Sequence, residues 1–359
     1  MKKYFVYELK KTFPILCTLT IILTALYLSQ VMLTSSLYFK AYNLSYISSI
    51  GSTLAVLVPA IVFRYKMKKR SIDLYYALPI SHTKIIVVKF LIGLILVYVP
   101  FTVAYWIGAA SVASNWYQEM ATIYYIPHYF STLIPIYLIY AISSFAYTRA
   151  NRAADGIGFV ILWMFAVALV MAVLSRMTSV HTLVDIAPDG YPAEIRTTVI
   201  YFINPYYYLP FAPLDCATSF FQSKLLMSDY TGYLIDTDTT GIANMAVGFT
   251  ITTLMGIGST VGLIMLEKKA KAENAQQISE SWFGGKVLIP LYTVCLISFS
   301  SLMSFFAPFY IVTIVTMMFA IYASYRRTIK IGIKGAIVFG SALLLGAILA
   351  FVCNIVWTV

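Results

Sequence analysis

The sequence predicts an all-α, polytopic membrane protein with about nine transmembrane helices, and three observations carry this prediction. Hydrophobic residues make up 60% of the 359-residue chain and charged residues only 11%, whereas soluble domains carry about a quarter charged residues. Twenty-nine Tyr and 23 Phe supply side chains of the kind that gathers at membrane–water interfaces. Nine segments are long and apolar enough to cross the hydrocarbon core as helices. This composition excludes a chain built only of soluble domains.

The predicted spans follow from apolar runs of about 20 residues. The first is too long for a signal peptide and lacks a small-residue cleavage site, so we expect a retained anchor. Residues 287–325 would be about 58 Å long as a single helix, twice the core thickness, so we expect a turn at 304–308. In chain order the nine spans are 13–35, 47–63, 85–107, 129–147, 157–174, 242–266, 287–305, 309–325 and 336–357.

The distribution of charge predicts the orientation of the spans. If the N-terminus is cytoplasmic and every span crosses once, 21 of the 25 Lys and Arg residues lie on the inner side. The positive-inside rule describes this asymmetry, so we expect a cytoplasmic N-terminus. The net charge of +11 is therefore interpreted as a property of cytoplasmic loops, and no nucleic-acid partner is expected.

The region 175–241 is predicted to be an external loop or small domain between spans five and six. Residues 197–211 compete for a tenth span, but the segment is short and two prolines break it. We interpret it as an aromatic segment against the outer interface, with two alternatives for its role. It either folds over the outer mouth of a transport path or only anchors the chain there. The candidate outer-mouth residues are Tyr206, Tyr207 and Tyr208.

Motifs for catalysis and for cofactors are missing from the sequence. There is no GxSxG, HExxH or GxxxxGK pattern, and the histidines His82, His128 and His181 have no acidic partner at metal-ligand spacing. We therefore expect no catalytic, metal or cofactor site in this chain. The spans also lack the buried acids that ion-coupled carriers use, and Lys89 is expected to reach the cytoplasmic surface by snorkelling. In the sixth span, the Gly258–Gly262 GxxxG pattern suggests a helix-packing face.

The first cytoplasmic loop, residues 63–90, contains the most informative pattern. A basic run at 64–70 precedes Ser71, a plausible N-cap, and a short apolar helix is predicted over 71–78. Anionic lipid explains the basic run, but it does not explain the apolar residues that follow. We therefore predict that the helix docks another protein. The candidate docking residues are Ile72, Asp73, Leu74, Tyr75, Leu78 and Pro79.

The stretch SIDLYYALPIS at 71–81, followed by Lys84 and Lys89, resembles the first cytoplasmic loop of ABC transporter permeases of the type-2 export class in Gram-positive bacteria. His82 stands where that family usually has a basic residue. The segment MKKYFVYELKKTF is similar to the amphipathic elbow helix that precedes the first span in the family, here 1–12, with Tyr4 among the residues expected to face lipid. The segment EKKAKAENAQQIS, in the cytoplasmic loop 267–286, is similar to the one that follows the sixth span.

The resemblance implies a six-span permease core at 13–266, with three additional spans in 287–359. It implies that the 71–78 helix is a coupling helix that binds a separate ATP-binding cassette ATPase, and that the chain pairs with a second copy or a sister permease. The chain would then export an unidentified cargo, with a peptide, a drug and a lipid all open, and carry no ATPase site of its own. The aromatic external loop suggests an amphipathic cargo. Two alternatives stay open: a membrane enzyme acting on lipid-linked sugar, based on Asp236-Thr237-Asp238, and a sensory or structural membrane protein.

Overall fold

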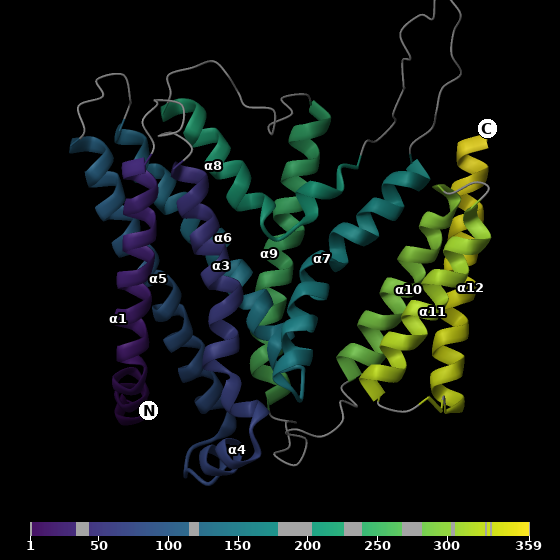
Figure 1. Cartoon of the computed structure of the whole chain (residues 1–359), viewed down its shortest axis with the longest axis horizontal. Helices are drawn as coiled ribbons and strands as arrows, with labels where there is room; N and C mark the ends of the chain where they lie inside the picture. The colour runs from purple at the N-terminus through teal and green to yellow at the C-terminus, as the bar shows by residue number, and fades with distance from the viewer. Residues whose placement is uncertain are drawn as a thin grey trace, which may run out of the picture. The chain divides into compact units, whose positions relative to one another are not determined.

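The computed structural model describes residues 2–33, 43–114, 122–178, 203–225, 239–267, 282–302, 306–326, 329–330 and 332–358, and these contain helices and no strand. Within these ranges, nine helices are long and apolar enough to cross a membrane. This agrees with the predicted all-α fold and with the number of spans (Figure 1). A spanning segment must satisfy its backbone hydrogen bonds internally, which favours helices in chains of this composition.

Eight of the nine are single α-helices, and the seventh, Gly284–Ser301, combines the π-helix η5 (Gly284–Leu288), α10 (Ile289–Ser298) and most of η6 (Phe299–Leu302). Within the apolar stretch 287–325, η6 ends at Leu302 and α11 begins at Ala307, and the first residues of the expected turn at 304–308 lie outside the described residues. The eight are α1 (Lys2–Leu33), α3 (Asn43–Val62), α5 (His82–Ser114), α6 (Tyr125–Thr148), α7 (Ala153–Thr178), α9 (Thr239–Glu267), α11 (Ala307–Arg326) and α12 (Ile333–Thr358).

The chain divides into two compact units, and α7 runs from one into the other. The first unit contains residues 1–164 and 210–277, and the second contains 165–209 and 278–359. In the first, α1 packs along α5, α3 packs against α5 and α6, and α9 packs against α6. The short helix α8 (Ala212–Leu225) packs on α3 and α6. In the second, α10 packs against α12 and α11 around Ile297, Ile314 and Met318.

Glycines mark the closest helix contacts in the first unit. Gly108 of α5 lies directly against the ring of Tyr27 from α1, where any Cβ would overlap the ring. On α9, a Cβ at Gly262 would stand 2.9 Å from Phe145, whereas a Cβ at Gly258 would meet nothing within 4 Å. Of the two glycines in the predicted GxxxG packing face, only Gly262 therefore lies close to another helix. The second close contact of α9 with α6 comes from Gly256, which lies against Leu138.

The N-terminal part of the chain differs from the sequence prediction. A separate elbow helix at 1–12 was expected before the first span, but α1 is one continuous helix with Pro14 inside it. Its 32 residues extend roughly 48 Å at 1.5 Å per residue, well beyond a hydrocarbon core of about 30 Å. Because the lysines of α1 stand at positions 2, 3, 10 and 11, we expect its first turns to be the part that lies outside the apolar layer.

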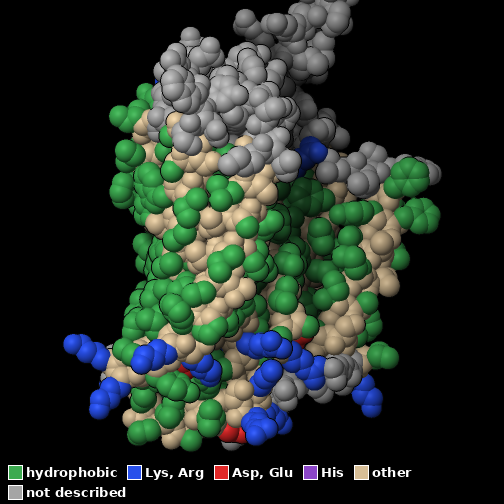
Figure 2. All heavy atoms as spheres, turned by 60° about the vertical axis from the view of Figure 1, so that its left-hand side comes forward, with side chains coloured by type: hydrophobic (Ala, Val, Ile, Leu, Met, Phe, Trp, Pro, Cys, Tyr) green, Lys and Arg blue, Asp and Glu red, His purple; other side chains and the backbone are tan. Residues whose placement is uncertain are grey.

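Basic side chains gather at one end of the first unit. Figure 2 shows them at the lower end of the view, where the start of α1 and the short helix α4 (Lys69–Tyr76) lie in Figure 1. The starts of α5 and α7 and the end of α6 reach the same end, because successive helices alternate in direction. The segregation of charge that the sequence predicts is therefore present in the folded unit.

Candidate functional site

The loop between α3 and α5 folds into two short helices. The 3-10 helix η1 (Arg64–Met67) follows α3, and α4 (Lys69–Tyr76) follows it before the chain enters α5 at His82. The predicted helix at 71–78 therefore exists, but it begins and ends two residues earlier. Its N-cap position is Lys68, which makes no side-chain capping bond, so the predicted capping role of Ser71 is wrong.

The six predicted docking residues separate into an inner and an outer group. Ile72 and Tyr75 are buried, with exposed fractions of 2% and 6%. Leu74 is 68% exposed and Leu78 is 37% exposed, and Asp73 and Pro79 are exposed as well. Ile72 and Tyr75 lie three positions apart and so share one face of α4. In this conformation only the outer group is accessible to a partner.

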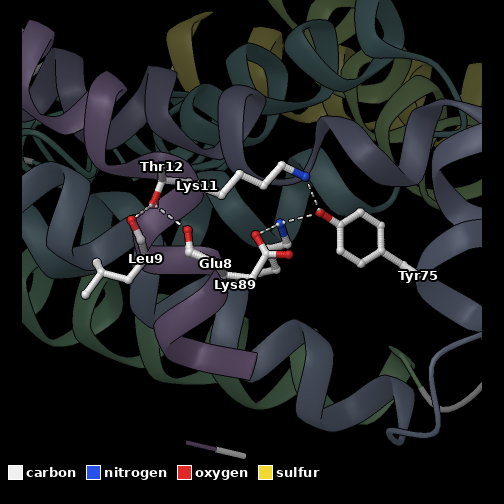
Figure 3. A network of polar contacts seen from close by, with 6 residues as sticks. All are labelled: Glu8, Leu9, Lys11, Thr12, Tyr75 and Lys89. Atoms are coloured by element: carbon white, nitrogen blue, oxygen red, sulfur yellow. Dashed lines mark hydrogen bonds and ion pairs between the residues drawn. The ribbon is translucent and has the colours of Figure 1, made fainter. Parts of the chain in front are cut away.

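Tyr75 belongs to a buried polar network that joins α4 to α1 and α5 (Figure 3). The Nζ of Lys89 on α5 lies 2.6 Å from Oε2 of Glu8 on α1 and donates a second hydrogen bond, 3.1 Å long, to the Tyr75 hydroxyl. Lys11 Nζ donates to the same hydroxyl at 3.1 Å. The Glu8 and Lys89 side chains are only 0% and 8% exposed. This ion pair is therefore desolvated, and each charge depends on the other.

Tyr76, the next residue, joins α4 to α9 through a second buried ion pair. Its hydroxyl donates to Oε1 of Glu267 at 3.3 Å, and Lys66 Nζ lies 2.5 Å from Oε2 of the same carboxylate. Burial lowers the pKa of Lys66, and the Glu267 carboxylate opposes that shift. The pKa of Arg149 is also lowered by burial and supported by Glu267. Glu267, the last residue of α9, therefore balances two desolvated cations.

Aromatic contacts complete the inner face of α4. The Tyr65 and Tyr75 rings lie 4.7 Å apart between centroids, and Lys89 Nζ lies 4.7 Å from the centroid of Tyr75 and 5.2 Å from that of Tyr65. His82, which departs from the resembled motif, stacks on Tyr76 at 3.9 Å. The electron-rich faces of the Tyr65 and Tyr75 rings lie next to the Lys89 ammonium and attract its positive charge. Two adjacent tyrosines thus attach one short helix to three spanning helices, α1 and α5 through Tyr75 and α9 through Tyr76.

Three sequence predictions about this region need correction. Lys89 does not snorkel to the surface but is buried beside Glu8, and Tyr4, which was expected to face lipid, is 8% exposed. Glu267 is a buried partner of Lys66 and not a loop residue. One signal was present in the sequence: Glu8 is the only acid before Asp73, and it stands four residues after Tyr4 on the same helix face.

A second polar cluster lies at the opposite end of the first unit. Nδ1 of His128 lies 2.8 Å from the Tyr105 hydroxyl, and Nε2 lies 3.3 Å from the Thr218 hydroxyl and 3.5 Å from that of Ser48. Ser48 and Thr218 are themselves 2.8 Å apart. All four side chains are at most 2% exposed, so a substrate has no access to them. They connect α8 to α3, α5 and α6.

The other sites predicted from the sequence provide less information about function. Tyr206, Tyr207 and Tyr208 form the 3-10 helix η3 (Pro205–Tyr208), in which Tyr207 and Tyr208 are buried, and their outer-mouth role stays a prediction. His181 and the motif at 236–238 lie outside the described residues. Within the part of the chain that the structure describes, no group of three or more His, Cys, Asp or Glu residues is arranged to hold a metal ion.

Comparison of the chain with protein-family models, with curated proteins and with solved structures finds no match. The functional conclusion therefore depends on the chain's own residues. The α4 region combines three properties: exposed leucines, a fixed position between three spanning helices, and two desolvated ion pairs. Among the described residues, this combination makes α4 the main candidate functional site.

Proposed function

We propose that this chain is the membrane-spanning permease subunit of an ATP-driven ABC exporter, and that α4 docks a separate ATP-binding cassette subunit. The observation that carries the proposal is the outer face of α4, where Leu74 is 68% exposed on a helix held by two buried ion pairs. The chain pairs with a second copy or a sister permease in the bacterial plasma membrane. Its cargo is an amphipathic molecule, and ATP is hydrolysed outside this chain.

A protein partner accounts for the outer face of α4 better than a lipid surface does. Figure 1 shows α4 beyond the ends of the neighbouring helices, among the basic side chains visible in Figure 2. Contact with anionic head groups requires only the basic residues of the loop. Binding energy at protein interfaces instead comes from a few large apolar anchors, and Leu74 and Leu78 supply them. A helix fixed by buried contacts also presents these anchors with little loss of entropy.

Capture of the ATPase tests the docking assignment. In a pull-down with a candidate ATP-binding cassette subunit, we expect Leu74→Ala/Leu78→Ala to lose the complex, because each truncation removes about 1–3 kcal/mol of interface energy. Lys68→Ala/Lys69→Ala, a pair of exposed residues at the N-cap and the first position of α4, should retain it. Retention by the leucine variant together with loss by the lysine variant would refute docking through α4.

Labelling of intact cells tests the orientation. In a cysteine-free background, we place single cysteines at positions 73, 236 and 271; the last two lie outside the described residues. An impermeant maleimide should label position 236 alone if the end where the basic side chains gather in Figure 2 faces the cytoplasm, as the positive-inside rule predicts. Labelling at 73 but not at 236 would reverse the proposed topology and remove α4 from the reach of a cytoplasmic ATPase.

A further inference from the structure

The first three turns of α1 have two chemically different faces. The inner face carries Tyr4 and Glu8, which are 8% and 0% exposed, together with Lys11, whose Nζ bonds to Tyr75. Glu8 is the only acid on α1, and its charge is neutralised by Lys89 inside the unit. The remaining charges on these turns are therefore lysines, which leaves the outer face positive.

The outer face carries Lys3, Tyr7 and Lys10. Their spacing of i, i+4 and i+7 aligns them along one side of a helix. All three are exposed, Tyr7 by 60% of its surface. The two lysines stand about 10 Å apart along the axis at 1.5 Å per residue, so their flexible stems can converge on one group above Tyr7. These residues form a small cationic surface with a hydroxyl donor at its centre.

The same face continues along α1 as an apolar surface. Pro14 and Ile21, at the next positions of this stripe, are exposed, Ile21 by 69%. Of the helices that can span the membrane, α1 has the smallest share of its apolar window buried, 11%. Because α1 is longer than the hydrocarbon core is thick, its lysines emerge at head-group level while Ile21 remains at the level of the acyl chains. One helix face thus offers a cationic part followed by an apolar part.

We propose that an anionic phospholipid binds this face of α1. Its phosphate accepts hydrogen bonds from Lys3, Lys10 and Tyr7, and an acyl chain lies along Pro14 and Ile21. The charge of the surface selects an anionic head group, and the apolar continuation selects a lipid over a soluble phosphate or an acidic protein. The bound lipid supports the first turns of α1 from outside, while the Glu8–Lys89 pair holds them from inside. This site is independent of the proposed ATPase docking on α4.

The test uses the purified full-length chain in detergent, titrated with a phosphatidylglycerol or with a phosphatidylcholine of identical acyl chains. We expect phosphatidylglycerol to bind more tightly and to raise the temperature of thermal unfolding. Lys3→Gln/Lys10→Gln should weaken its binding about 30-fold, because each lysine near an anionic head group contributes about fivefold. Tyr7→Phe should weaken binding by a smaller factor. Lys68→Gln/Lys69→Gln removes the same charge from the exposed start of α4 and should leave binding unchanged.

Two outcomes would overturn the proposal. Equal losses in the two lysine variants would mean that the lipid responds only to net charge. Equal stabilisation by glycerol phosphate, which has no acyl chain, would mean that α1 binds phosphate and not a lipid. Circular dichroism of each variant without lipid confirms that it is folded before binding is compared, and a single-residue variant, Lys10→Gln, replaces the double variant if that one is unfolded.

Discussion

Replacing Lys89 by Met is expected to cost about 3–5 kcal/mol of unfolding free energy, because the change leaves the Glu8 carboxylate buried without its partner. Glu8 is 0% exposed, and the Lys89 ammonium also donates a hydrogen bond to the Tyr75 hydroxyl. The substitution therefore loosens α1 and α4 together. Thermal unfolding of the purified chain in detergent measures the loss.

Lys84 supplies the matched control for this prediction. It lies on the same helix, five residues earlier, and is exposed, so Lys84→Met should change stability by no more than about 0.5 kcal/mol. The double variant Glu8→Gln/Lys89→Met removes both charges and should recover most of the loss, since buried pairs can be replaced by neutral groups at little cost. If Lys89→Met is as stable as Lys84→Met, the buried ion pair does not hold this end of the unit.

The spanning helices could be predicted from the sequence because they depend on a local property. A helix in a membrane needs a run of apolar residues of sufficient length, and each of the nine runs satisfies that condition without reference to any other part of the chain. The short helix in the first cytoplasmic loop was predictable for a similar reason, since Pro79 and the residues around it limit its length. Hydropathy and local breakers therefore account for the order of elements.

The partners within the candidate site could not be predicted in this way. Glu8 and Lys89 are 81 positions apart, and Lys66 and Glu267 are 201 apart. Their pairing depends on how α1 and α9 pack against other helices, which the apolar pattern of each helix does not specify. A lysine near the start of a span is as compatible with snorkelling as with burial, and only the presence of Glu8 beside it decides between them.

The sequence also does not specify which face of α4 is buried. Ile72, Leu74, Tyr75 and Leu78 are all apolar or aromatic, so an eight-residue helix can bury either side. Tertiary contacts decide the matter, because the Tyr75 hydroxyl finds Lys11 and Lys89 whereas Leu74 has no polar group to satisfy. Tyr75 was therefore predicted as a docking residue although it is a buried contact of α4, and Leu74 and Leu78 remain as candidate anchors.

Replacing Glu267 by Gln is expected to detach α4 from α9, with a loss of about 3–5 kcal/mol of unfolding free energy. The Glu267 side chain is 1% exposed and faces the ammonium of Lys66, which is left buried without a counter-charge. A cysteine at Ile72, a residue 2% exposed in the native chain, reports the change directly. Maleimide should label it faster in Glu267→Gln, but at the native rate in Asp73→Asn, which alters an exposed acid of α4.

The loss in Glu267→Gln should depend on pH in a defined direction. Burial lowers the pKa of Lys66 below its ordinary value of 10.5, and the variant removes the carboxylate that opposes this shift. The native state of the variant then binds fewer protons than the unfolded state over the range between the lowered pKa and 10.5, so its stability rises with pH there. The deficit relative to the native chain should narrow as the pH increases through that range. A deficit that does not change with pH would mean that Lys66 stays charged without Glu267, and that another group on the inner face of α4 holds it.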